Sequence, residues 1–168
     1  GTGLVWGRQG QWRHVMPTIP TIMAAEPANA WRQERAPQGD TQAAWVSPGG
    51  FLAFENQWAM IEAFRFIEQI GRKRIAERVA ELNGQLKEGL AKLPNVSLLT
   101  PQDAQFSAGI VCCDVKGQAP KDVVAKLKAQ NIIASATPYR HTSVRFSAGI
   151  TNTPQDIEKT LQVMHSLT

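Results

Sequence analysis

The residue with the clearest chemical potential is Arg145, which stands between Val144 and Phe146 in a short apolar stretch. A guanidinium group is planar and donates two parallel hydrogen bonds to a carboxylate or phosphate, so an arginine in this setting is suited to binding an anion. The alternative is a surface or structural ion pair, for which Asp156 and Glu158 lie close in the sequence. The residues alone leave both interpretations open.

The other reactive side chains form no recognisable catalytic or metal-binding motif. His14, His141 and His165 show no HxH or HExxH spacing, and no G-x-S-x-G elbow or P-loop is present. We therefore expect no metal site. Cys112 and Cys113 are neighbours on a predicted strand, where side chains point to opposite faces and rarely bond each other. Their apolar setting, "AGIVCCDV", predicts core packing rather than reactivity.

The composition indicates a globular chain. Of the 168 residues, 43% are hydrophobic and 19% are charged, which allows a sizeable core. The net charge is +4, and the basic residues are scattered rather than gathered in a tail. No stretch reaches the roughly 18 apolar residues of a membrane helix. We expect neither nucleic acid nor a membrane as a partner. The compartment is unknown from the sequence, with the cytoplasm favoured.

Regular elements must position Arg145, and the apolar periodicity predicts them. Helices are predicted at 51–70 and from Gly71 to Leu93, because apolar residues recur there every three or four positions. Strands are predicted at 96–100, 107–115, 132–136 and 143–147, with a helix at 120–130. This alternation predicts an α/β or α+β fold: a small sheet covered by helices on one face.

The two ends of the chain differ in how clearly they can be interpreted. Residues 3–8 are predicted as a short strand, and 9–48 as a loop with one or two short strands. The last helix is predicted at 153–167. Thr153 is suited to cap it, Pro154 to occupy its first position, and Asp156 to complete a capping box.

Residues 144–156, "VRFSAGITNTPQD", resemble the C-terminal signature of class V, fold-type I enzymes that depend on pyridoxal 5'-phosphate. This superfamily includes cysteine desulfurases, isopenicillin N epimerase-like proteins and class V aminotransferases. The rest of the chain is similar in order. "GTGLVWG" resembles the strand after the cofactor-binding lysine, residues 63–101 the long helix that leads into the small domain, and "SAGIVCCDVKG" the first main strand of that domain.

The resemblance implies roles for several residues. Arg145 falls on the arginine that binds the substrate α-carboxylate, while the pyridoxal ring performs the carbanion chemistry. Many relatives contact the cofactor phosphate with a Gly-Thr pair across a dimer interface, and its counterpart here is Gly50-Phe51, which has no hydroxyl. Ser47, or the backbone N–H groups at Gly49 and Gly50, are the candidates to replace it.

Other implications concern partners and chemistry. The resemblance implies a homodimer and an amino-acid or keto-acid substrate. The cofactor-binding lysine is expected a few residues before Gly1, so this chain alone is expected to bind no pyridoxal phosphate and to be inactive. Cysteine desulfurases carry a catalytic cysteine in the loop before the arginine. The corresponding loop, "TPYRHT" at 137–142, has none, which disfavours desulfuration.

Two functional hypotheses follow. In the first, residues 1–70 are the end of the cofactor-binding large domain, including the irregular segment 9–48. Residues 71–94 are then the linking helix, and 95–168 are the small C-terminal domain. The intact protein is a transaminase, epimerase or lyase of amino acids. In the second, the chain is a non-catalytic interaction or scaffold module derived from that small domain.

Overall fold

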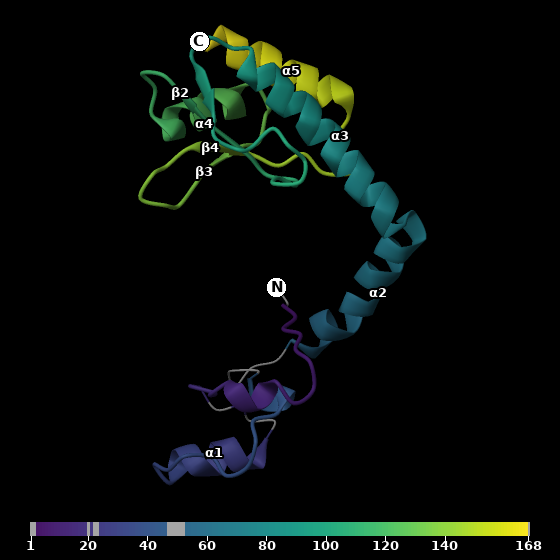
Figure 1. Cartoon of the computed structure of the whole chain (residues 1–168), viewed down its shortest axis with the longest axis vertical. Coiled ribbons are helices and arrows are strands. Elements are labelled where there is room, and N and C mark those ends of the chain that lie inside the picture. The colour runs from purple at the N-terminus through teal and green to yellow at the C-terminus, as the bar shows by residue number, and fades with distance from the viewer. Residues whose placement is uncertain (1–2, 20, 22–23, 47–52, 168) are drawn as a thin grey trace. The chain divides into compact units, whose positions relative to one another are not determined.

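The computed structural model describes residues 3–19, 21, 24–46 and 53–167 (Figure 1). The chain divides into two compact units, residues 1–66 and 67–168, which are described separately. Within the part of the chain described here, no helix has the length and apolar character that crossing a membrane requires.

The N-terminal unit consists of short helices joined by irregular segments (Figure 1). Two 3-10 turns, Trp12–His14 and Ala43–Val46, lie on either side of helix α1, Ala25–Arg32. The prediction of a strand at 3–8 is wrong: described residues 3–8 contain no strand, and Trp6 is 77% exposed. A strand is stable only when a neighbour pairs with it, and no described residue pairs with this segment. The prediction for 9–48 is also wrong, because it missed α1.

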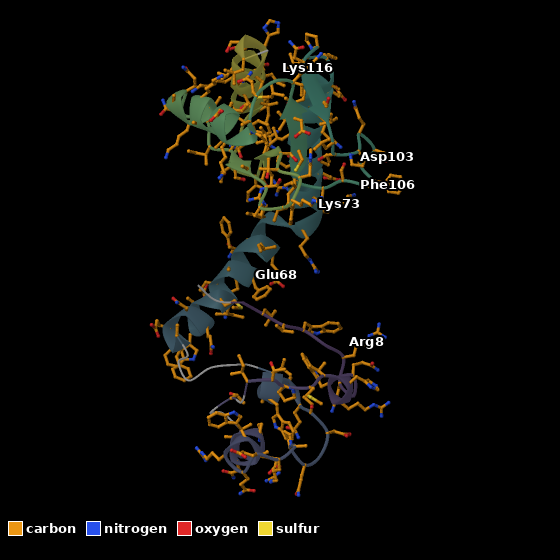
Figure 2. All side chains as sticks on the ribbon, turned by 90° about the vertical axis from the view of Figure 1, so that its left-hand side faces the viewer. Arg8, Glu68, Lys73, Asp103, Phe106 and Lys116 are labelled. Atoms are coloured by element: carbon orange, nitrogen blue, oxygen red, sulfur yellow. The ribbon has the colours of Figure 1, made fainter. Side chains whose placement is uncertain are left out.

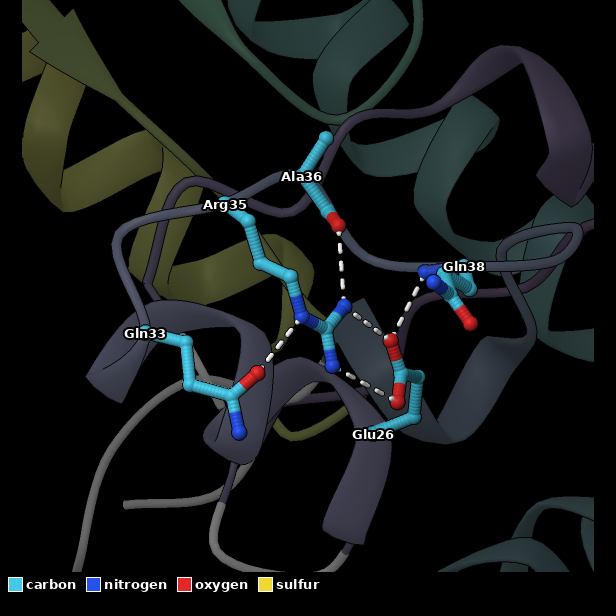
Figure 3. A network of polar contacts seen from close by, with 5 residues as sticks. All are labelled: Glu26, Gln33, Arg35, Ala36 and Gln38. Atoms are coloured by element: carbon cyan, nitrogen blue, oxygen red, sulfur yellow. Dashed lines mark hydrogen bonds and ion pairs between the residues drawn. The ribbon is translucent and has the colours of Figure 1, made fainter.

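A polar network links α1 to the turn that follows it (Figure 3). Arg35 Nη1 and Nη2 donate to the Glu26 carboxylate at 2.7 and 3.4 Å, and the Gln38 backbone N–H donates to the same carboxylate at 2.8 Å. Arg35 Nε also donates to Gln33 Oε1 at 2.8 Å. These hydrogen bonds, chiefly that from Arg35, hold the pKa of Glu26 below its usual range. The network fixes the turn 33–38 against the helix.

Two consecutive helices follow, as the apolar periodicity predicts. Helix α2 spans Phe54–Ile70 and helix α3 spans Arg72–Ala91. Gly71 separates them with a φ of 95°, a backbone conformation that glycine adopts without steric cost. No residue of α2 is buried, whereas α3 buries Leu82, Leu86 and Leu90.

The C-terminal unit contains a four-stranded antiparallel sheet with the strand order β1-β2-β4-β3. The strands are β1 at Val96–Leu98, β2 at Val111–Val115, β3 at Ser135–Ala136 and β4 at Val144–Phe146. Helix α4, Pro120–Ala129, connects β2 to β3, and helix α5, Pro154–Ser166, follows β4. Each element lies within its predicted range and is shorter by a few residues.

One face of the sheet carries the core. Val111, Cys113 and Val144 are fully buried there, in the same cluster as the buried faces of all three helices. The cluster includes the leucines of α3, Val123 and Leu127 of α4, and Ile157 and Met164 of α5. Figure 1 shows α3 and α5 running side by side over this sheet. The prediction of a small sheet with helices on one face is therefore confirmed, and no described helix of this unit covers the opposite face, which we call the open face.

The loop between β1 and β2 is anchored by a buried lysine. Lys87 of α3 is 5% exposed, and its Nζ donates to the backbone oxygens of Pro101 and Gln102 and to Ser107 Oγ at 2.6–3.1 Å. Asp103 and Phe106, at the outer part of this loop, point away from the unit (Figure 2). Because three neutral acceptors satisfy the ammonium group, a cation is tolerated at a core-facing position.

Candidate functional site

Arg145 lies at the centre of the open face of the sheet. Successive residues of a strand point to opposite faces, and its neighbours Val144 and Phe146 are buried in the core. The strand register pairs Arg145 with Cys112 of β2 on one side and with Ser135 of β3 on the other. These three side chains therefore share the face that the helices leave uncovered.

Of the three guanidinium nitrogens of Arg145, only Nε makes a hydrogen bond to a described residue. Its Nε donates a hydrogen bond to Ser135 Oγ at 3.0 Å, and the side chain is half-buried. Neither Nη1 nor Nη2 contacts a described polar group. No described carboxylate pairs with it, and the Asp156 carboxylate is used at the start of α5. The alternative of a structural ion pair with Asp156 or Glu158 is therefore wrong for the described part of the chain.

Beside this guanidinium the open face is hollowed. The hollow has a volume of about 430 Å³. Its described lining residues are Ile110, Ile133, Ala134, Ser135, Arg145 and Ser147. They come from the residue before β2, from β3 and the two residues before it, and from β4 and the residue after it, so antiparallel pairing brings together residues far apart in the sequence.

The segment after Arg145 is fixed by side chains of α3. Asn83 is 1% exposed; its Nδ2 donates to the Ala148 carbonyl at 2.9 Å, and its Oδ1 accepts from the Ala148 N–H at 3.4 Å. It thus pairs with Ala148 as a neighbouring strand would. Arg78 Nη2 donates to the Asn152 carbonyl at 3.1 Å, and Asn152 Oδ1 accepts from the Gly149 N–H at 2.9 Å.

The predicted capping box is present. Thr153 Oγ1 accepts from the Asp156 N–H at 3.2 Å, and the Asp156 carboxylate accepts from the Thr153 N–H at 2.8 Å. This hydrogen bond to the Thr153 backbone is the main reason that the pKa of Asp156 lies below its usual range. The box and the Asn83 pairing hold the backbone on the C-terminal side of Arg145.

The loop 137–142, which precedes β4, closes on itself and is tied to the sheet. The Ser143 N–H donates to Thr137 Oγ1 at 2.9 Å, and the Thr137 N–H donates to the Ser143 carbonyl at 3.0 Å. His141 Nε2 contacts Asp114 Oδ2 of β2 at 2.9 Å. The second oxygen, Asp114 Oδ1, is buried and has no hydrogen-bond partner among the described residues. A histidine and a carboxylate thus lie on the same face as Arg145.

The two cysteines occupy different environments. Cys113 is fully buried in the core, and burial raises the pKa of its thiol to about 12. Cys112 is half-buried and faces the open side, opposite Arg145. The prediction that both pack in the core is therefore correct for Cys113 and wrong for Cys112, because alternation along β2 directs one thiol to each face.

Several site predictions fall outside the described residues. Ser47, Gly49 and Gly50, the candidates for contacting a cofactor phosphate, lie in the part of the chain that the structure does not describe. Among the described residues, no group of three or more His, Cys, Asp or Glu side chains is placed to hold a metal ion.

Sequence reasoning missed two supporting residues. Asn83 could have been predicted from the sequence. It falls between Val79 and Leu86 in the apolar stripe of α3, where a polar side chain is expected to be buried and to need a hydrogen-bond partner. Ser135 could not have been predicted, because nothing in "IIASA" indicates that this serine pairs with Arg145 until the strand register is known.

Comparisons with known proteins agree with this geometry. The family model for aminotransferase class-V matches residues 1–160. The apo cysteine desulfurase from Thermococcus onnurineus NA1 is similar in structure, with a TM-score of 0.70 and 20% identity over 95% of this chain and 41% of that chain. The cystine C–S lyase C-DES, in complex with its product cysteine persulfide, has a TM-score of 0.70 and 16% identity over 94% of this chain and 40% of that one.

A mutant of C-DES with glycine covalently linked to its pyridoxal phosphate cofactor has a TM-score of 0.63 and 18% identity, over 89% of this chain and 37% of that one. No curated protein sequence matches the chain. Because the family model covers nearly the whole chain, this protein belongs to the aminotransferase class-V family, and its fold is that of part of a fold-type I pyridoxal phosphate enzyme. The chain spans about 40% of the length of the first two of these solved structures.

Proposed function

We propose that this chain supplies the substrate-carboxylate arginine of a pyridoxal phosphate-dependent enzyme that acts on an amino acid or keto acid, and that Arg145 is this residue. The observation that carries the proposal is the arginine's bonding: one nitrogen is fixed by Ser135 and two have no described partner. A structural arginine on a sheet would instead place its charge against a carboxylate.

The geometry favours an end-on grip. Because Ser135 engages Nε, the fork that remains consists of Nη1 and Nη2, which match the two oxygens of a carboxylate. The half-buried position strengthens such a pair relative to a fully exposed one. Residues 148–156, which follow β4 in the chain, are held by Asn83 and by the capping box. The backbone on the C-terminal side of Arg145 is therefore fixed, and this limits movement of the guanidinium.

On the open face, Nη1 and Nη2 of Arg145 have no hydrogen-bond partner among the described residues, which suits the carboxylate end of a substrate. The candidates for the cofactor phosphate, Ser47, Gly49 and Gly50, lie outside the described residues. Pyridoxal phosphate, when bound, supplies an electron sink for a carbanion at the substrate α-carbon. The part of Arg145 is to bind and orient the carboxylate, which lowers the entropic cost of the reaction.

The reaction type that fits best is transamination, epimerisation or lyase chemistry. The loop 137–142 closes through Thr137 and Ser143 and contains no cysteine, so this loop offers no thiol to accept sulfur. Cys112, which pairs with Arg145 in the sheet, lies on strand β2 and not on this loop. The absence of a cysteine from the loop weighs against desulfuration, even though cysteine desulfurases are among the similar structures.

The experiment uses the intact enzyme that contains this chain. Arg145→Ala and Arg145→Lys should both lower kcat/KM by about 30- to 1,000-fold, since lysine keeps the charge and loses the fork. Arg140→Gln is the matched control: it removes one exposed arginine from the neighbouring loop and should leave kcat/KM within about twofold. Melting temperatures should agree among the variants. A wild-type kcat/KM in Arg145→Ala would end the assignment.

The second hypothesis is an interaction or scaffold module without chemistry. The observation that favours it is helix α2, where Phe54, Trp58, Ile61 and Phe64 form an apolar stripe that is 44–74% exposed. The phenyl and indole rings of Phe54 and Trp58 lie 6.1 Å apart. Under this hypothesis, Arg145 substitutions change no activity and Trp58→Glu abolishes partner binding.

We also propose that a second copy of the chain covers this stripe, as expected for a homodimer. A helix with an exposed aromatic stripe gains stability when an equivalent stripe packs against it. Sedimentation should show a dimer for the wild type and a monomer for Trp58→Glu. Trp31→Glu, which changes an equally exposed tryptophan on α1, should remain dimeric. A monomeric wild type would contradict the proposal.

A further inference from the structure

The hollow beside Arg145 has one charged wall, and its other walls are largely aliphatic. Among the described residues that line it, Arg145 is the only charged one. Ser147 Oγ donates to the Gly109 carbonyl at 2.8 Å, and Ser135 Oγ accepts from Arg145, so each hydroxyl group already makes one hydrogen bond and neither carries a charge. The remaining lining consists of Ile110, Ile133 and Ala134.

The two isoleucines are placed on either side of the guanidinium. Ile110 directly precedes β2 and Ile133 lies two residues before β3, and these are the strands that flank Arg145 in the sheet. Ile110 is 52% exposed and Ile133 is 83% exposed. Each therefore has apolar surface available to a ligand that is anchored at Arg145, and burying that surface is favourable.

The size of the hollow suits a small molecule. Its volume of about 430 Å³ lies in the range of about 300–1,000 Å³ that is usual for ligand pockets. A second carboxylate or an ammonium group on the ligand side chain would find no charged partner in the described lining. Taking such a group out of water without a partner would be unfavourable.

Resting on the function proposed above, we propose that the substrate bound by Arg145 is a monocarboxylic amino or keto acid whose aliphatic side chain packs against Ile110 and Ile133. Arg145 would bind the carboxylate, and Ile110 and Ile133 would favour an aliphatic side chain. Ile110 and Ile133 are then specificity-determining residues, while Arg145 sets the affinity for the carboxylate itself.

The test measures binding of simple probes to the 168-residue chain by NMR titration. The probes are acetate, 4-methylpentanoate, glutarate and the uncharged amide 4-methylpentanamide. We expect 4-methylpentanoate to bind about tenfold more tightly than acetate, since the open hollow buries part of its branched alkyl group against the two isoleucines. Glutarate should bind no better than acetate, and the amide should bind weakly.

Variants separate the two isoleucines from the arginine. Ile110→Ser and Ile133→Ser should each remove most of the advantage of 4-methylpentanoate and leave acetate binding unchanged. Ile150→Ser, which alters an exposed isoleucine outside the hollow, should change neither. Arg145→Gln should abolish binding of all three acids. All three isoleucines are exposed, so these variants should keep the fold.

The outcomes distinguish this inference from the function on which it rests. Equal affinities for acetate and 4-methylpentanoate, both lost in Arg145→Gln, would overturn the aliphatic specificity and leave the carboxylate grip intact. Binding of glutarate that is tighter than that of acetate would also overturn the aliphatic specificity and leave the carboxylate-binding role of Arg145 intact. If the acids bind no better than the amide and Arg145→Gln changes nothing, or if no acid binds at all, the proposed function fails along with the inference.

Discussion

Arg145 Nε donates a hydrogen bond to Ser135 Oγ at 3.0 Å, and this bond joins two residues paired in register across β4 and β3. It fixes the plane of the guanidinium and leaves its terminal fork facing the open side of the sheet. A guanidinium without this contact would rotate about its side-chain torsions and lose binding free energy when it is ordered by a ligand. Under the function proposed above, Ser135 is therefore a positioning residue for Arg145.

Removing the Ser135 hydroxyl should weaken carboxylate binding. Under the proposed function, Ser135→Ala in the intact enzyme should raise KM about 3- to 10-fold with kcat nearly unchanged, because the Ser135 hydroxyl only orients the guanidinium and its loss costs about as much as one ordinary hydrogen bond. Ser135→Thr keeps the hydroxyl and should restore KM. Ser97→Ala, an exposed serine on β1, is the control. A parallel fall in kcat, or no rescue by threonine, would argue against a positioning role.

The sequence predicted the C-terminal unit well because its signals are local. The stripe of α3, the capping box of Thr153 and Asp156, and the short β-rich runs depend on neighbours only a few residues away. Residues 3–8 were wrongly predicted as a strand because strand formation requires a partner that the local pattern does not reveal. Helix α1 was missed because its stability depends on Glu26 and Arg35, which are nine residues apart.

The candidate site was only half predictable. Arg145 was identifiable because a charged residue interrupts an apolar strand, but its partner Ser135 and its neighbour Cys112 follow from strand register. Register is set by long-range pairing, which single-sequence periodicity does not encode. The sequence predicts that Cys112 and Cys113 face opposite sides of the sheet, because side chains alternate along a strand. It does not predict which side the helices cover, because that depends on how the helices pack.

The Asn83 side chain should contribute strongly to the free energy of unfolding, because it bonds both backbone groups of Ala148. Asn83→Ala leaves the N–H and carbonyl of Ala148 without their side-chain partner, so we expect a loss of about 2–3 kcal/mol in the free energy of unfolding. Asn83→Asp should cost more, because it adds a buried charge and removes the donor. Asn56→Ala on exposed α2 is the control. Urea titration gives the values, and amide exchange at Ala148 and Gly149 should accelerate. Unchanged exchange there would contradict the pairing.

The two helical glycines of α3 should respond oppositely to alanine. A Cβ at Gly89 would overlap the side chain of Leu161 of α5, whereas a Cβ at Gly84 would meet no described atom within 4 Å. Gly89→Ala should therefore destabilise the protein by about 1–3 kcal/mol. Gly84→Ala should stabilise it by up to about 1 kcal/mol through helix propensity. Leu161→Ala should relieve much of the Gly89→Ala penalty in the double variant. Equal effects of the two alanines would show that α3 and α5 are not in close contact.

The adjacent cysteines should differ in reactivity. Iodoacetamide at about pH 8 should label Cys112 in the folded chain and spare Cys113, because burial raises the pKa of the Cys113 thiol to about 12. Mass spectrometry of peptides from Cys112→Ser and Cys113→Ala variants assigns the label, and both thiols should react in urea. A bulky label on Cys112 should also weaken carboxylate binding, since it faces the same side as Arg145. Labelling of Cys113 first would reverse the assignment of the two faces.

The capping box should make stability fall in acid. The Thr153 N–H donates to the Asp156 carboxylate and holds the pKa of Asp156 below its ordinary value of 3.8 in the folded chain. The unfolded state therefore binds a proton more readily than the folded state, so the stabilisation is fully present above that ordinary value. It is lost as the pH falls through the lower folded value.

Asp156→Asn should therefore lower the free energy of unfolding at about pH 7 and reduce its decrease between about pH 5 and pH 3. Thr153→Ala should also destabilise the chain, by about 1 kcal/mol at neutral pH, because it removes the cap to the Asp156 N–H. Asp122→Asn in the first turn of α4, which lacks a side-chain cap, is the matched control. Urea titrations across this pH range supply the measurement. An acid slope in Asp156→Asn as steep as that of the wild type would place the titrating group elsewhere, for example at Glu26, whose pKa is also lowered in the folded chain.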